Sequence, residues 1–178
     1  MPFSMNIFVA LAFIWRLGSV PVSSRNEKAL KRNGGREVGA FNSAVLALSH
    51  VAYYVVATIE GIYNPVFNRS VSIIGIVIYI AAAAALISVV TTLGRLWTVK
   101  IIINPIHPLI RSGLFSHFRH PNYFISIVPE LIGFALAVNA YWTLVVGLPL
   151  YFIPLIIRIR QEEAAMWEAV EGYKDRMS

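Results

Sequence analysis

The sequence contains no cysteine and few charged residues. Of its 178 residues, 13% are Asp, Glu, Lys or Arg, whereas soluble domains carry about 25%. The absence of cysteine excludes disulfides, thiolate metal ligands and a cysteine nucleophile. Hydrophobic residues make up 57% of the chain and the mean hydropathy is +0.66, which is more apolar surface than one small core can bury. The composition therefore predicts an integral membrane protein that forms a single domain over residues 1–178.

Acidic residues are scarcer than basic ones, which leaves a formal net charge of +6. In a soluble protein this charge would suggest a nucleic-acid partner. Here the basic residues lie in short clusters between apolar runs, so membrane topology and lipid headgroups explain them better. We expect membrane lipids as partners and no nucleic acid. The first apolar stretch has no basic region before it and contains Arg16, so we expect it to remain as a membrane helix rather than be cleaved.

Long apolar runs predict the fold class. A membrane-spanning helix needs about 20 mostly apolar residues. Three runs within residues 1–91 meet this length, and two shorter ones are joined only by Asn139-Ala140, which predicts a helical hairpin. The five runs are Phe3–Val22, Ala40–Ile59, Val71–Thr91, Phe124–Val138 and Tyr141–Ile157. The last segment, Arg158–Met177, has the pattern of an amphipathic helix. We predict an all-α, multi-pass membrane protein with about five transmembrane helices, a C-terminal hairpin and an amphipathic C-terminal helix.

The distribution of basic residues predicts the orientation. With five spans and the N-terminus outside, every basic cluster falls on one face, and the opposite face retains only Arg69. The positive-inside rule assigns the basic face to the cytosol. We therefore expect the C-terminus and the polar loop before the hairpin to be cytosolic.

That polar loop, Asn104–Tyr123, reads NPIHPLIRSGLFSHFRHPNY and carries most of the possible chemistry. Its prolines fix φ, remove backbone donors and push the preceding histidines away from helical angles. Backbone groups in such a loop are free to meet a ligand, although a purely structural, stiff loop gives the same pattern. His107 and His120 are thirteen residues apart and no acidic residue lies between them, which argues against a metal site.

Ionisable residues within or beside the apolar runs are further candidates. Arg158 and Glu162 are four residues apart, so they share one face of a helix at the membrane boundary. Glu130 lies inside the fourth run, where a carboxylate is costly and usually faces an interior or a cavity. Arg16 is a plausible partner for a membrane glutamate. His50 lies in the middle of the second run, where a histidine is most often a neutral hydrogen-bonding residue between helices.

Two motifs together resemble the isoprenylcysteine carboxyl methyltransferase family of membrane methyltransferases. They are HPLIRSGLFSHFRHPNY before the hairpin and RIRQEEAAMWEAVEGY after it, in which an arginine precedes a glutamate by four residues. The similarity makes residues 92–178 the methyltransferase-like catalytic part. The first half is similar to a bacterial subgroup of the family, some members of which are associated with lipid-like polyketides. That part of the similarity rests on Arg25-Asn26-Glu27, on His50 with Glu60, and on Glu130.

The resemblance implies S-adenosylmethionine as the methyl donor, bound on the cytosolic side. Carried over by position, Glu162 would hold the cofactor and Arg158 would face the methyl acceptor, although the tail spacing leaves Arg160 as a second choice. The remaining implied cofactor-binding residues are His107, Pro108, Leu109, Ile110, Phe115, His120, Pro121, Asn122 and Tyr123. Phe115 departs from the family pattern, which usually has tyrosine there.

The acceptor stays open at this point. The resemblance implies a lipophilic or prenylated acceptor, and either a prenylcysteine-type carboxylate or a phenolic or pyrone lipid hydroxyl is compatible. A carboxylate needs an arginine but no base, whereas a hydroxyl must lose a proton, which makes Glu130 a candidate catalytic residue. Two other classes are weighed against the methyltransferase: a lipid-binding or transporter-like protein, disfavoured by the lack of internal repeats, and a membrane reductase of similar C-terminal architecture.

Overall fold

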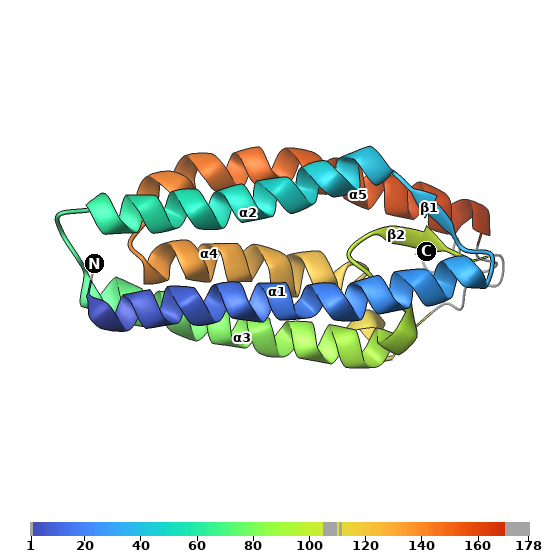
Figure 1. Cartoon of the computed structure of the whole chain (residues 1–178), viewed down its shortest axis with the longest axis horizontal. Coiled ribbons are helices and arrows are strands. Elements are labelled where there is room, and N and C mark those ends of the chain that lie inside the picture. The colour runs from blue at the N-terminus through green and yellow to red at the C-terminus, as the bar shows by residue number, and fades with distance from the viewer. Residues whose placement is uncertain (1, 105–109, 111, 170–178) are drawn as a thin grey trace.

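A computed structural model of the chain describes residues 2–104, 110 and 112–169. Five α-helices run lengthwise beside one another and form an up-and-down bundle (Figure 1). Their bounds are α1 Phe3–Arg32, α2 Ala40–Tyr63, α3 Arg69–Leu93, α4 Val128–Ala137 and α5 Leu148–Ala169. Two π-helical turns, Asn122–Ile127 and Thr143–Gly147, lead into α4 and α5, and short 3-10 turns lie at Gly94–Leu96 and Gly113–Ser116. The predicted all-α, multi-pass fold is confirmed.

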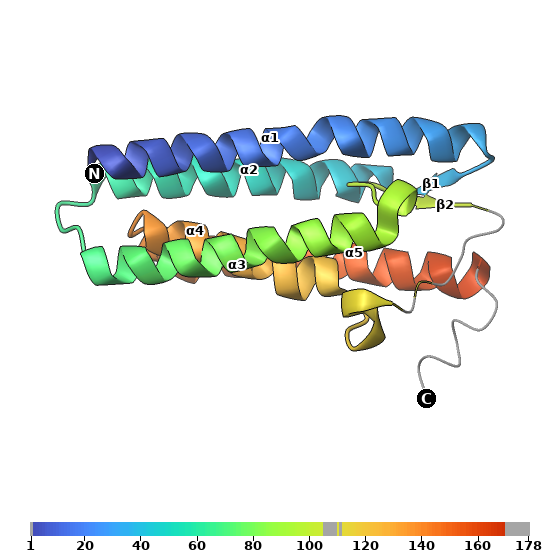
Figure 2. The ribbon, with the colours of Figure 1, turned by 90° about the horizontal axis from the view of Figure 1, so that it is seen from below.

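The bundle has two chemically different ends. The amino end carries the N-terminus, the α2–α3 connection and the α4–α5 turn (Figures 1 and 2). The strand end carries two short strands, β1 (Arg36–Val38) and β2 (Ile101–Ile103), which pair antiparallel. Among the basic residues of the described chain, Arg69 begins α3 at the amino end, and most of the others lie towards the strand end. The predicted asymmetry of charge is therefore an asymmetry between the two ends of one bundle.

The outer surface of the bundle is apolar along its length. Among the described residues, four helices are long and apolar enough to cross a membrane, and the hairpin helix Asn122–Ala137 is apolar but shorter. Large aliphatic side chains point outward from them, including Ile14, Leu48 and Val77. An α-helix makes most of its backbone hydrogen bonds internally, so a bundle with such an apolar surface suits hydrocarbon better than water. The chain is an integral membrane protein.

Two helices are longer than their apolar runs predict. Helix α1 continues ten residues past the predicted limit at Val22 and ends at Arg32. Helix α5 continues through Arg158 to Ala169, so the predicted amphipathic helix is, in its described part, the polar end of α5 rather than a separate element. Residues 170–178 lie outside the described residues. Both extensions carry helix beyond the apolar zone and build the strand end.

Helices α3 and α4 cross at two glycines. A Cβ atom added at Gly133 would lie 2.6 Å from the backbone nitrogen of Tyr79, and one added at Gly75 would collide with the backbone of Ala137. Small residues at such a crossing let two backbones approach closely. Ser72 uses this proximity to donate from Oγ to the Ala137 carbonyl at 2.6 Å. The crossing holds α4 in the interior, where Leu131 and Phe134 are fully buried.

The hairpin turn at Asn139 is confirmed and reaches the amino end. Asn139 is fully buried and has a left-handed φ of 60°, which asparagine tolerates better than most residues. Its Oδ1 accepts from the Asn68 backbone at 2.6 Å, and its carbonyl accepts from Asn64 Nδ2 at 2.9 Å. The carboxylate of Glu60 accepts from the Trp142 and Thr143 backbone nitrogens, both at 2.7 Å. The turn of the hairpin therefore lies at the amino end of the bundle, beside the α2–α3 connection.

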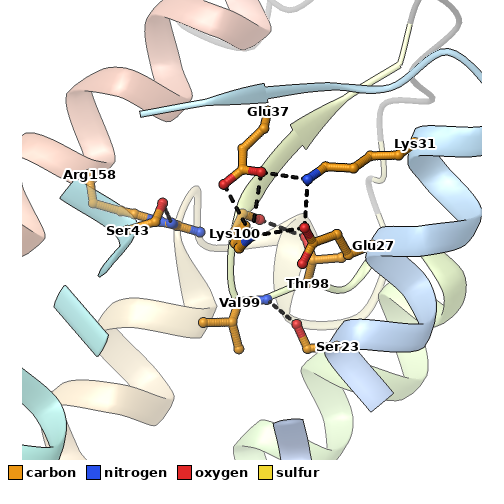
Figure 3. Close-up of polar contacts among 9 residues, drawn as sticks. All are labelled: Ser23, Glu27, Lys31, Glu37, Ser43, Thr98, Val99, Lys100 and Arg158. Carbon is orange, nitrogen blue, oxygen red and sulfur yellow. Dashed lines mark hydrogen bonds and ion pairs between the residues drawn. The ribbon is translucent and has the colours of Figure 1, made fainter. Parts of the chain in front are cut away.

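The strand end is held by an ionic cluster that the sequence did not predict. Lys31 and Lys100 lie between the carboxylates of Glu27 and Glu37, with nitrogen–oxygen distances of 2.6 to 3.3 Å (Figure 3). The hydrogen bonds from Lys31 and Lys100 hold the pKa of Glu37 below its ordinary value, against the opposing effect of partial burial. Beside the cluster, Ser23 accepts from the Val99 backbone at 2.8 Å. These contacts fix β1 and the segment before β2 against the end of α1.

Candidate active site

A cavity of about 130 Å³ lies at the strand end, between the start of the hairpin, β2 and the polar part of α5. The lining contains most of the predicted site residues that the structure describes: Ile110, Phe115, His120, Pro121, Asn122, Tyr123, Arg158 and Glu162. The structure thus brings together side chains from before and after the hairpin. The predicted residues His107, Pro108 and Leu109 lie outside the described residues. We call this cavity the outer chamber.

The hydroxyl of Tyr123 connects two charged residues of the outer chamber. Tyr123 lies in the π-helical turn after Pro121, and 5% of the residue is exposed. Its hydroxyl donates to Glu162 Oε2 at 2.5 Å and accepts from Arg158 Nε at 3.1 Å. Arg158 and Glu162 are one turn apart on α5, so both reach the same hydroxyl. The predicted arginine–glutamate pair is therefore joined through a tyrosine from the other motif.

Arg158 faces the interior of the bundle. It is only 4% exposed, and its Nη1 donates to Ser43 Oγ on α2 at 2.7 Å (Figure 3). Contacts from two directions, at Nε and Nη1, fix the plane of the guanidinium. Arg160 is exposed on another face of the same helix. Of the two candidate arginines, Arg158 is the one whose side chain lines the chamber.

His120 and Asn122 present polar atoms that lack partners. The His120 Nε2 atom lies 3.0 Å from Glu163 Oε1, and its ring stacks on Tyr123 at a centroid distance of 5.9 Å. His120 Nδ1 and Asn122 Oδ1 are buried and have no hydrogen-bond partner among the described residues. Buried polar atoms are normally paired. Both residues line the outer chamber, so a polar ligand there would pair them.

Several lining residues were missed by the sequence reasoning. Trp97, Thr98 and Lys100 follow the end of α3, and Ile101–Ile103 form β2. Asn26 on α1 holds the first of these segments through a 2.8 Å bond from Nδ2 to the Trp97 carbonyl. No local motif marks these residues, because their position depends on the pairing of β2 with β1 and on the extension of α1.

A second cavity, of about 60 Å³, lies deeper in the bundle, and we call it the inner chamber. The side chains common to both linings are Trp97, Thr98, Asn122, Tyr123 and Arg158. The inner chamber is further lined by Arg16 and Ser19 of α1, by Ser43, Leu46, Ala47 and His50 of α2, by Leu86 of α3, by Tyr151 of α5, and by Val99 and Ile127. A thin layer of shared side chains therefore separates a polar entrance from a chamber inside the membrane zone.

Glu130 lies deeper in the bundle beside the inner chamber, in a polar cluster. It is fully buried on α4. Arg16 Nη1 lies 3.3 Å from Glu130 Oε2, and Tyr54 donates to Glu130 Oε1 at 2.5 Å. The predicted pairing of Arg16 with a membrane glutamate is confirmed. In the described chain, the residues that line the two chambers do not include Glu130, although its partner Arg16 lines the inner one.

Comparison with known proteins agrees with this geometry. Residues 73–168 match the model of the isoprenylcysteine carboxyl methyltransferase (ICMT) family. An uncharacterized protein of Haemophilus influenzae is 46% identical over 162 residues, which cover 91% of this chain and 94% of that protein. Uncharacterized protein YpbQ of Bacillus subtilis is 25% identical over 169 residues, which cover 91% of this chain and 96% of that protein. No solved structure matches the chain. The chain belongs to the isoprenylcysteine carboxyl methyltransferase family and is an integral membrane methyltransferase.

Proposed function

We propose that this protein uses S-adenosylmethionine to methylate an oxygen of a lipophilic acceptor within the membrane. The acceptor would be a prenylcysteine-type carboxylate or a phenolic or pyrone lipid hydroxyl. The observation that carries the proposal is the hydroxyl of Tyr123, which joins Glu162 and Arg158 where the two chambers meet. The Tyr123 hydroxyl thereby links Glu162, proposed to hold the cofactor, to Arg158, proposed to bind the acceptor.

The residues of the outer chamber fit the cofactor. Glu162 offers a carboxylate to hydroxyl or ammonium donors, and the unpaired atoms of His120 and Asn122 offer further hydrogen bonds. Aromatic and apolar surface comes from Ile110, Phe115, Pro121 and Tyr123. By position in the family motif, His107, Pro108 and Leu109 would complete the site. When bound, S-adenosylmethionine would supply a methyl group carried by a positively charged sulfur.

Arg158 would bind the acceptor. A guanidinium has five N–H donors, and the contacts to Tyr123 and Ser43 use Nε and Nη1. A fixed guanidinium attracts and orients an oxygen that carries negative charge. Burial keeps water away from this oxygen, which strengthens the attraction.

The orientation in the membrane follows from the same arrangement. The strand end carries the basic clusters and the outer chamber, so we propose that it faces the cytosol, where the polar cofactor is available. The N-terminus would then be outside. The acceptor would arrive from the bilayer, because its chain is apolar.

The test is equilibrium binding of S-adenosylmethionine and S-adenosylhomocysteine to the detergent-purified protein. We expect saturable binding that Glu162→Ala and His120→Ala each weaken by about 10- to 150-fold, since one hydrogen bond to a charged group contributes about 1.5–3 kcal/mol. Glu168→Ala is the matched control, because this side chain lies on the same helix and is 74% exposed. A folded sample that binds neither compound would overturn the cofactor assignment.

A further inference from the structure

Three residues of the inner-chamber lining carry a polar atom without a partner among the described residues. His50 Nε2, Trp97 Nε1 and Asn122 Oδ1 are all buried and have no hydrogen-bond partner among the residues that the structure describes. All three side chains belong to the chamber lining. Each unpaired buried atom costs about 1–3 kcal/mol. A polar headgroup in the chamber would remove this cost, so the lining is shaped for a ligand rather than for apolar packing.

The charges around the chamber indicate what kind of headgroup fits. Arg16 and Arg158 both line it, from α1 and α5. Two guanidinium groups favour an oxygen that is anionic, or that becomes anionic during the reaction. Neither arginine can take a proton, because the guanidinium remains charged in proteins. If the acceptor oxygen carries a proton on arrival, another group must receive it.

His50 is placed to receive that proton. It is 8% exposed, and its Nδ1 lies 3.3 Å from the Tyr151 hydroxyl. Its Nε2 lies 4.0 Å from Glu130 Oε1, too far for a hydrogen bond. The ring also stacks on Tyr54 at 5.1 Å. The groups around the imidazole are thus Arg16 of α1, Tyr54 of α2, Glu130 of α4, and Tyr151 and Arg158 of α5.

Glu130 is less well placed for the same task. Arg16 and Tyr54 occupy its two oxygens, whereas His50 lines the inner chamber with a free ring nitrogen. Glu130 Oε1 lies 4.0 Å from His50 Nε2 without a hydrogen bond between them, so Glu130 is a neighbour of the imidazole rather than the group that receives the proton.

We propose that His50 is the general base that takes the proton of a hydroxyl-bearing lipid acceptor held in the inner chamber. This inference rests on the proposed function. As the acceptor oxygen bonds to the methyl carbon, the bond from that carbon to the donor sulfur breaks, and the sulfur keeps the electron pair. The acceptor's proton goes to His50 Nε2. A carboxylate acceptor, already ionised near neutral pH, needs no such base, so His50 selects a phenol or enol.

The test uses a nitrophenol bearing a long alkyl chain, because its absorbance reports the ionised fraction directly. With the cofactor omitted, we expect the wild-type protein to bind the probe and raise its ionised fraction above that in empty detergent micelles. His50→Asn keeps a polar atom near the position of Nδ1 and removes Nε2, so the increase should be lost. His50→Gln serves as the second variant should His50→Asn fail to fold. His117→Gln, at an exposed site in the polar loop, is the matched control.

Turnover provides the second readout. In His50→Asn, methylation of a long-chain alkylphenol should fall by about 10²- to 10⁴-fold in kcat, the usual contribution of a general base. Methylation of a farnesylated cysteine by the same variant should change little, and binding of S-adenosylhomocysteine should be retained. Equal ionisation of the probe by wild type and folded His50→Asn would overturn the assignment of His50. If the wild-type protein does not bind S-adenosylhomocysteine, the proposed function is overturned. The ionisation test uses no cofactor, so its result for His50 is independent of that outcome.

Discussion

The ion pair between Arg16 and Glu130 provides a direct test of how this bundle is held together. The pair joins α1 to α4, and the glutamate is fully buried with Arg16 Nη1 at 3.3 Å. Replacing Arg16 with methionine keeps an unbranched apolar stem but removes the guanidinium, and so leaves a carboxylate in the interior without its cation. Tyr54 would remain as its hydrogen-bond donor.

The expected magnitude follows from the burial of the pair. Removing one partner of a buried ion pair costs about 3–5 kcal/mol, whereas replacing both partners is often close to neutral. For a chain of this length, 1 kcal/mol shifts Tm by about 2–4 °C. Arg16→Met should therefore lower Tm by roughly 6–20 °C. The double variant Arg16→Met/Glu130→Gln should recover most of this loss, because no charge is then buried unpaired.

Thermal unfolding of the wild type, Arg16→Met, Glu130→Gln and the double variant in one detergent measures the coupling between the two side chains. Arg25→Met is the matched control, since Arg25 is an exposed residue on the same helix, and it should melt close to the wild type. The reasoning is refuted if Arg16→Met melts within about 2 °C of the wild type, less than 1 kcal/mol on the same scale. It is equally refuted if the double variant is no more stable than the single one.

Three further predictions concern the fold and the strand end. Gly133→Ala should destabilise the protein by several kcal/mol or prevent folding, because its Cβ would meet the Tyr79 backbone nitrogen at 2.6 Å, while Gly18→Ala, with open space around it, should be neutral in the same melting assay. Because the Lys31 ammonium lowers the pKa of Glu37, this carboxylate stabilises the fold near pH 7 and loses its contribution as the pH falls through the lowered value. The Tm of Glu37→Gln should therefore lie below wild type at pH 7 and approach it under acid conditions; a constant gap would contradict this. Glu60→Gln should lower stability by about 1–2 kcal/mol, since a full carboxylate caps the start of the last helix, and an unchanged Tm would contradict the capping role.

The sequence predicted the features that depend on local composition. Apolar runs of sufficient length identified the spans, and the two short runs around Asn139 identified the hairpin, because neither depends on distant contacts. The high cost of a buried charge was enough to suggest a membrane glutamate as the partner of Arg16, and the structure identifies that glutamate as Glu130. Composition alone could not reveal that α1 extends to Arg32, since hydropathy records the thickness of the apolar zone and not the length of the helix.

The features that escaped prediction depend on tertiary packing. Strands β1 and β2 have three residues each, too few for a periodic signal, and their pairing needs segments more than sixty residues apart. Ser43 holds Arg158 only because α2 packs against α5. The sequence placed His50 in a span as a neutral packing residue, but its position on the inner chamber follows from the shared lining of α1, α2 and α5.

The location of Glu130 on α4 also constrains how the protein is made. Its partners Arg16 and Tyr54 lie on α1 and α2, and Tyr79 on α3 is hydrogen-bonded to Tyr54; all three helices leave the ribosome before α4. The helix Asn122–Ala137 is too short to cross a bilayer alone and carries a carboxylate. Insertion of this helix becomes favourable under two conditions. The first three helices must already be in the membrane, where they pair the Glu130 carboxylate, and α5 must follow as the second arm of the hairpin. Truncation after α4 should therefore leave a nascent chain that is retained at the translocon, and the order of the helices along the chain is itself part of how the buried carboxylate is accommodated.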